Sequence, residues 1–350
     1  MKKITKILIS LFASTMISLS AFAGELTVTG TAKATYNTVS GTANGDNTLG
    51  VTNEFTIGAA GELENGWTWT YALNMDPEDT AAGGATLNDD SALTLSTNVG
   101  TVAVYGSNGG LNVSGNFNAN AYAWITDTGY SEGKVEPNNI SDYMNMQYHT
   151  PAGLLPFGLQ GKIAYAPSGS TNVKSGNASN TAASATVGNM TMYQVSATPI
   201  EGLAVSASYG TIDAGNGVTS NEQNDESGAL ALKYSAGPVT LGFSRSLDAP
   251  VIADGGAAVA ATTVEYYQNT NYSIGFAVNE NLSVSYSNES SEQNFVTTST
   301  VGYDQDTQSF QAAYTMGGMT IALARTDYDN VGYANNADVT ETMLAVTMAF

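Results

Sequence analysis

Residues 340–350, TETMLAVTMAF, end the chain on a phenylalanine and carry its main structural signal. Counting back in twos from the end gives one apolar face, made of Leu344, Val346, Met348 and Phe350. The opposite face is small or polar, apart from Met343. Because a β-strand has a period of two, this pattern predicts a strand whose apolar face meets either a dry core or lipid.

The same alternation recurs about sixteen times along the chain, and helical periodicity is nearly absent. Short turns are expected at residues 64–66, 98–100, 199–202, 236–237, 279–281 and 317–318. Long polar loops are expected near residues 40–50, 76–90, 107–141, 167–188, 213–226, 247–262, 291–306 and 329–339. Such alternation of short and long connections is typical of outer-membrane barrels, whose short turns face the periplasm. We therefore predict an all-β fold, a transmembrane antiparallel β-barrel of about 16 strands.

A soluble β-sandwich or a secreted repeat protein would also show alternation. Three features favour the barrel. The two-faced pattern persists through the whole chain, its polar face is rich in hydroxyls and lightly charged, and aromatic residues gather near strand ends. Such aromatic residues would form a girdle at the membrane interface.

The first 23 residues have the pattern of a secretory signal peptide. Three lysines supply a positive start, residues 7–19 form the apolar stretch, and Ala21-Phe22-Ala23 gives a small-x-small cleavage site. The apolar stretch is too short to span a bilayer comfortably, which makes a membrane anchor the weaker alternative. We predict a signal peptide over residues 1–23 and one barrel domain over residues 24–350.

Composition excludes several functions. The chain holds 31 acidic and 10 basic residues, which argues against nucleic-acid binding. It has no cysteine, so disulfides and thiolate metal sites are excluded. The acidic stretches 304–306 and 327–329 match no known calcium-loop spacing, so solvated loops are favoured. No metal site and no cofactor is predicted.

Nothing in the sequence marks an enzyme. An outer-membrane hydrolase would need a general base beside a nucleophile on the outer face. The sole histidine, His149, lies beside a turn that we expect to be periplasmic. No carboxylate pair stands out among so many acids, so we predict no enzymatic activity.

The chain resembles the general porins of Gram-negative bacteria, and is most similar to the sixteen-stranded porins of alphaproteobacteria. The resemblance rests on the strand–loop rhythm, the terminal strand TETMLAVTMAF and an unusually long third loop. It implies that the barrel-assembly machinery reads Phe350, that the third loop folds into the lumen, and that three barrels form a homotrimer in the outer membrane. Family members often carry an arginine cluster on the barrel wall, whereas residues 101–106 contain none.

Strand parity predicts which side chains line the pore. Lys33, Glu54, Lys162 and Lys233 each lie opposite an apolar face, and Tyr105 also falls inward. A charge at bilayer depth is costly on the lipid side but not in a wet lumen, so we expect these residues to point inward. The alternative is that each is an inert lumen residue.

The third loop, from Asn108 to Asp142, is the expected filter. Its glycines permit a turn inward, and Tyr122, Trp124 and Ile125 would pack against the inner wall. The resulting constriction would carry Asp127, Glu132 and Glu136, facing Lys33 and Lys162, and opposed charges in a narrow gap orient polar solutes. The alternative is an exposed, external loop.

Two arginines break the rule that strand charges face the lumen. Arg245 and Arg325 share parity with apolar residues near the outer ends of their strands. We expect them at the outer rim, where a guanidinium pairs with lipopolysaccharide phosphates. A β-bulge that turns them inward is the alternative.

These observations predict an outer-membrane porin, a water-filled channel for passive diffusion of small hydrophilic solutes and ions. Because carboxylates outnumber the inward lysines, a mild cation preference is expected. A substrate-specific channel and a non-conducting surface or adhesin barrel are the alternatives.

Overall fold

The computed structural model describes residues 25–41, 47–76, 90–125, 137–167, 187–214, 221–253, 260, 262–297 and 302–350. The predicted signal peptide lies outside these ranges, and so its cleavage stays a prediction. No helix in the described ranges is long and apolar enough to cross a membrane.

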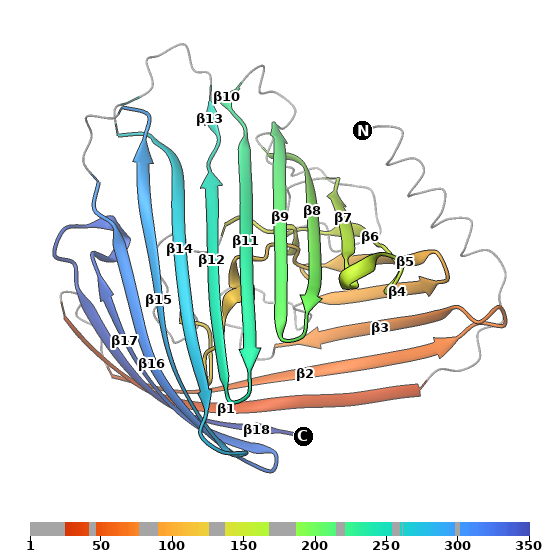
Figure 1. The fold of residues 1–350 in the computed structure, drawn as a ribbon, viewed down its shortest axis with the longest axis horizontal. Coiled ribbons are helices and arrows are strands. Elements are labelled where there is room, and N and C mark those ends of the chain that lie inside the picture. Colours follow the sequence, from red (N-terminus) through yellow and green to blue (C-terminus); the bar gives the residue numbers. More distant parts are fainter. Residues whose placement is uncertain are drawn as a thin grey trace.

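Sixteen antiparallel strands within the described ranges form one closed barrel (Figure 1). They are β1 (Glu25–Gly41), β2 (Thr48–Glu62), β3 (Thr68–Met75), β4 (Ser91–Thr97), β5 (Gly100–Gly106), β6 (Asn145–His149), β7 (Gln160–Ala166), β8 (Val187–Ile200), β9 (Leu203–Ala214), β11 (Asp225–Ala236), β12 (Val239–Ala249), β14 (Val264–Ala277), β15 (Leu282–Phe295), β16 (Gln305–Met316), β17 (Met319–Asp329) and β18 (Val339–Ala349). The predicted fold class and strand number are confirmed.

The connections follow the predicted rhythm. The β2–β3, β4–β5, β8–β9, β11–β12, β14–β15 and β16–β17 connections fall at the six expected short turns. Between β9 and β14, two further short strands, β10 (Asn221–Gln223) and β13 (Ile252–Ala253), pair with each other outside the barrel. The described residues also contain the short 3₁₀ helices η1 (Ser114–Phe117), η3 (Ile140–Asp142), η4 (Pro156–Gly158) and η5 (Val331–Tyr333).

The terminal strand closes the barrel. β18 pairs with β1 from Thr31↔Ala349 onward. Beyond that pair, Phe350 and Gly30 exchange two backbone hydrogen bonds of 2.9 and 3.0 Å. The Phe350 ring packs edge-on against Phe55, with centroids 5.7 Å apart. Closure leaves no unpaired sheet edge, which a lipid environment requires.

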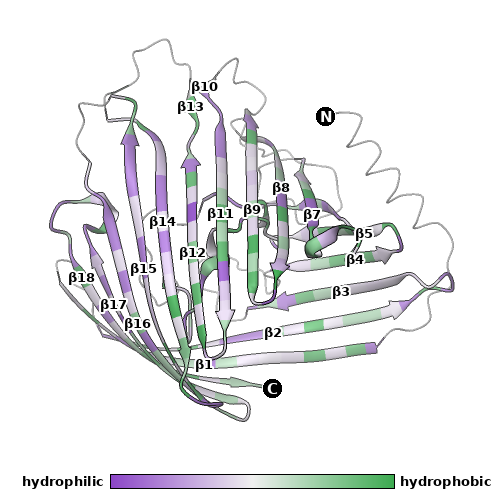
Figure 2. Ribbon diagram, viewed as in Figure 1, coloured by the Kyte–Doolittle hydropathy of each residue, from purple (hydrophilic) through white to green (hydrophobic). Residues whose placement is uncertain are grey.

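The barrel is apolar outside and polar inside. On β12, Leu241, Phe243 and Leu247 are 39–47% exposed, whereas Ser244 and Ser246 between them are at most 1% exposed. Figure 2 shows that the halves of β12, β14 and β15 near the short turns are the more hydrophobic, and that hydrophilic residues prevail toward the long loops. This distribution fits strands that cross the bilayer at one end and extend beyond it at the other.

Candidate functional site in the lumen

The outgoing part of the third loop lies against the inner wall. Its backbone N–H groups donate to inward side chains of successive strands: Val113 to Ser208 Oγ (3.2 Å), Ala119 to Ser273 Oγ (3.0 Å), Ala121 to Ser285 Oγ (2.8 Å), and both Tyr122 and Ala123 to Gln311 Oε1 (3.1 Å). These partners belong to β9, β14, β15 and β16. An irregular segment must satisfy its backbone groups without a strand partner, and the wall supplies those partners.

Two strand glycines make this close approach feasible. A Cβ atom built on Gly242 would overlap the Phe117 carbonyl, and one on Gly275 would overlap the Ala119 carbonyl. Ser273 lies beside them and donates its hydroxyl to Phe117 O at 2.9 Å. Glycine within a strand often marks such a backbone approach.

Buried apolar side chains hold both ends of the loop against the wall. Leu111, Val113, Phe117, Ile125 and Ile140 are each at most 1% exposed. Leu111 and Ile140 pack with the inward residues Ala164, Ala166, Met190, Met192 and Ile212 of β7, β8 and β9. Burying this apolar surface favours the inward path over an external one.

The returning part of the loop is anchored separately. Asn138 donates its backbone N–H to Asp248 Oδ1 (3.2 Å) and its side-chain amide to Asp225 Oδ1 (2.7 Å), and it accepts from Ser227 Oγ (3.1 Å). The two parts also meet each other, since the Asn112 amide donates to Pro137 O at 3.0 Å. The loop is therefore held against β8 to β16 at both of its legs.

Of the residues expected to pack inward, Ile125 is fully buried and the Trp124 indole N–H donates to Glu289 Oε1 at 2.5 Å. Asp127, Glu132 and Glu136 lie outside the described residues, so their place at a constriction stays a prediction. Sequence reasoning missed Leu111, Val113, Phe117 and Ile140. The feature of the sequence that could have identified them is that they are apolar residues inside a polar loop.

The wall formed by β1 to β4 carries exposed hydroxyls on its inward face. Thr52, Thr68 and Thr70 are exposed there although they lie on the inward face. Neighbouring strands are linked through these groups: Thr70 Oγ1 and Thr94 Oγ1 are 2.6 Å apart, and Thr56 donates to Asn74 Oδ1 at 2.7 Å.

The predicted pore-lining residues that belong to strands lie on the inward face. On the hydroxyl-rich wall, the cross-strand neighbours of Lys33 are Thr52 and Thr347, and the cross-strand neighbour of Glu54 is Thr31. The cross-strand neighbours of Lys162 are His149 on β6 and Gln194 on β8, on the wall that the third loop covers. None of the three inward lysines, Lys233 included, has a hydrogen bond or ion pair with a residue that the structure describes. Their role in permeation stays a prediction.

Tyr105 has a structural contact that parity alone did not indicate. It faces inward at the end of β5, between Ala92 and Asn145. A Cβ on Gly109 would overlap its ring, so the loop backbone passes directly over Tyr105. Gly109 has φ of +76°, a left-handed conformation that favours glycine. Tyr105 therefore supports the turn into the third loop.

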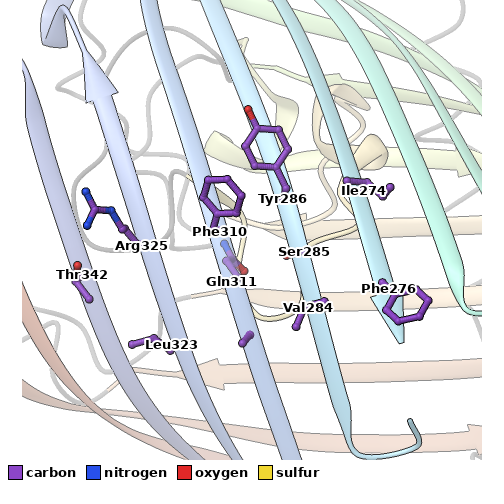
Figure 3. A pocket seen from close by; sticks show the side chains of 11 residues that line it. Ile274, Phe276, Val284, Ser285, Tyr286, Phe310, Gln311, Leu323, Arg325 and Thr342 are labelled. Atoms are coloured by element: carbon purple, nitrogen blue, oxygen red, sulfur yellow. The ribbon is translucent and has the colours of Figure 1, made fainter. Parts of the chain in front are cut away.

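Arg245 and Arg325 lie on the outer face of the barrel, on the same face of their strands as exposed apolar residues. Neither β12 nor β17 shows a register shift in its pairing, so the bulge that would turn them inward is not found there. Arg325 pairs with Asp327 at 3.3 Å. It also borders a depression of about 670 Å³ beside Tyr286, Phe310 and Leu323 (Figure 3).

An acidic cluster lies at the outer ends of β16 and β17. Asp306 and Asp329 are direct cross-strand partners, with Asp304 and Asp338 close by. Partial burial and then the charge of Asp306 raise the pKa of the Asp304 carboxyl. Among the residues that the structure describes, no group of three or more His, Asp or Glu side chains could hold a metal ion. The cluster instead gives this rim a negative potential.

A closed barrel with an apolar outside, a polar lumen and an inward loop has the architecture of an outer-membrane channel protein. A sequence model described as Gram-negative porin matches residues 10–347, and the chain belongs to this family. None of the curated protein sequences matches the chain significantly.

Solved porin structures share the fold over nearly the whole chain. An anion-selective porin from Comamonas acidovorans superposes with a TM-score of 0.67 at 15% identity, covering 93% of this chain and 100% of that one. The Salmonella typhi OmpF, solved with daunomycin, gives 0.62 at 16% identity, covering 94% and 98%. The trimer form of OmpT from Vibrio cholerae gives 0.65 at 13% identity, covering 94% and 100%.

Proposed function

We propose that this protein is a water-filled pore for passive diffusion of small hydrophilic solutes and ions across the outer membrane, exported with removal of residues 1–23. The observation that carries the proposal is the division of the lumen. The third loop is fastened along β8 to β16, while exposed hydroxyls on β1 to β4 line the remaining space. Hydroxyls replace water around a polar solute at little cost, since each both donates and accepts hydrogen bonds.

The alternatives are less well supported. A substrate-specific channel would be expected to carry a ladder of aromatic or arginine side chains, whereas this wall carries threonines. A non-conducting adhesin would have its lumen filled, which the exposed Thr52, Thr68 and Thr70 argue against. The family and fold favour a channel over an enzyme.

The pore is a homotrimer with mild cation preference. The trimer is supported by likeness to OmpT, which was solved in a trimer form. The preference is supported by the acidic excess of the chain and by the carboxylate cluster at the outer rim. A negative potential at a pore mouth concentrates cations there.

Purified protein in planar bilayers is expected to insert with large conductance in three equal steps. In a potassium chloride gradient, the reversal potential should have the sign of a few-fold potassium preference. This preference should shrink at 1 M salt, where the screening length falls to about 3 Å. Absence of conductance would exclude the pore, and a chloride preference would contradict only the selectivity.

The outward arginines bind lipopolysaccharide phosphate at the rim. The depression beside Arg325 offers apolar walls for acyl chains, and guanidinium recognises phosphate in a two-pronged geometry. The double variant R245Q/R325Q is expected to lower the lipopolysaccharide that copurifies with each barrel. K33Q, which removes a charge from the lumen, serves as the control and should change nothing. An unchanged amount of copurified lipopolysaccharide in the double variant would contradict this role of the two arginines.

A further inference from the structure

A small pocket lies on the inner wall between η1 and the periplasmic mouth. Its volume is about 210 Å³. The floor comes from residues of three neighbouring strands, β8, β9 and β11, and the roof from Asn116 of η1 and Gly158 of η4. A pocket of this volume has room for several water molecules, and so for a small hydrated ion.

One charged residue lines this pocket. Lys233 points inward from β11, opposite Ala204 and Gly242, three residues before that strand ends at a short turn. None of the other lining residues carries a charge, so no carboxylate in the pocket balances the ammonium. Lys233 has no ion pair or hydrogen bond with any residue in the described ranges.

Neutral hydroxyl donors line the same pocket as Lys233. Ser196 and Ser206 are cross-strand partners, and Thr198 follows on the same face of β8. The Asn116 amide donates to Ser206 Oγ at 3.0 Å, so the Ser206 hydroxyl hydrogen remains available to another acceptor. An ammonium group beside several hydroxyl donors, with no competing carboxylate, is the donor set that an oxyanion requires.

We propose that this Lys233 pocket is a binding site for a small oxyanion, such as inorganic phosphate, inside an otherwise cation-preferring lumen. The anion reaches it from the periplasmic mouth, because the pocket lies on the short-turn side of η1. Charge-assisted hydrogen bonds from Lys233 supply most of the affinity, and the hydroxyls supply the orientation. The route of access rests on the proposed pore, but the binding itself does not.

Calorimetric titration of the purified full chain in detergent with inorganic phosphate tests the site without requiring conductance. The wild-type protein should show saturable binding, and K233M should weaken it about tenfold or more, the size expected for a charge-assisted hydrogen bond. K233R should retain much of the binding. K33M removes an equal charge from the opposite wall and should leave the affinity within about twofold, since the two lysines are on different walls.

Thr198→Val removes one hydroxyl at nearly constant shape and provides a variant that does not depend on losing Lys233. It should weaken phosphate binding several-fold while the heat-resistant mobility of the barrel is unchanged. In bilayers, phosphate added on the periplasmic side should reduce the wild-type current and not that of K233M. No saturable binding by the wild type, or equal losses in K233M and K33M, would overturn the proposal. Loss of conductance with binding intact would overturn only the pore.

Discussion

Replacing residues 114–136 of the third loop by three glycines is expected to raise the single-channel conductance several-fold. The replacement is sterically feasible because the two legs of the loop meet at Asn112 and Pro137. It keeps the apolar anchors Leu111 and Ile140 on β7 to β9, and Val113 on β11, so these parts of the wall stay covered. Conductance should rise because residues 114–125 of the deleted segment lie against the inner wall along β12 to β16.

The matched control keeps the loop and neutralises the three acids of residues 114–136 as D127N/E132Q/E136Q. This variant should change the reversal potential with little effect on conductance, and so separates charge from obstruction. Conductance is read from single insertions, and the exclusion limit from liposome swelling with sugars of increasing size. An unchanged conductance in the shortened variant would show that the loop does not narrow the pore.

Gly242→Ala is expected to destabilise the barrel and loosen the third loop, because the added methyl would overlap the Phe117 carbonyl. Overpacking of this kind typically costs about 1–3 kcal/mol. It would also separate Phe117 from Ser273, breaking a buried hydrogen bond. The free energy of unfolding in denaturant should fall, and open-channel current should become noisier as the loop leaves the wall.

Gly50→Ala is the comparison for this substitution. Gly50 also lies in a strand on the inward face, but its nearest neighbour would be Thr35 Oγ1 at 3.5 Å, an ordinary contact. Its stability and current noise should match those of the wild type. Equal effects of the two substitutions would mean that strand glycines matter for strand formation and not for seating the loop.

Much of the barrel was predictable from local pattern. The short turns at 236–237 and 317–318 separate strands where expected, and Leu344, Val346 and Met348 alternate with inward residues as the period of two requires. The parity of Arg245 also placed it on the outer face. These inferences succeed because neighbouring residues of a strand must point to opposite faces.

The third loop was only partly predictable. Trp124 and Ile125 were expected against the wall, but the sequence did not indicate that Gly242 and Gly275 would receive the loop backbone. A glycine in a strand has several causes, such as a bulge or a close approach, and local pattern does not distinguish them. The role of Tyr105 in lining the pore stays a prediction, and local pattern did not indicate that the turn at Gly109 would pass over its ring.

The sequence by itself determined the period of two, the alternation of short and long connections, and hence a barrel with lipid outside and water inside. Only the tertiary structure decided which wall the third loop covers. The physical reason is distance along the chain. Trp124 meets Glu289 across 165 positions and Ala123 meets Gln311 across 188, and such contacts exist only once barrel closure has brought those strands together.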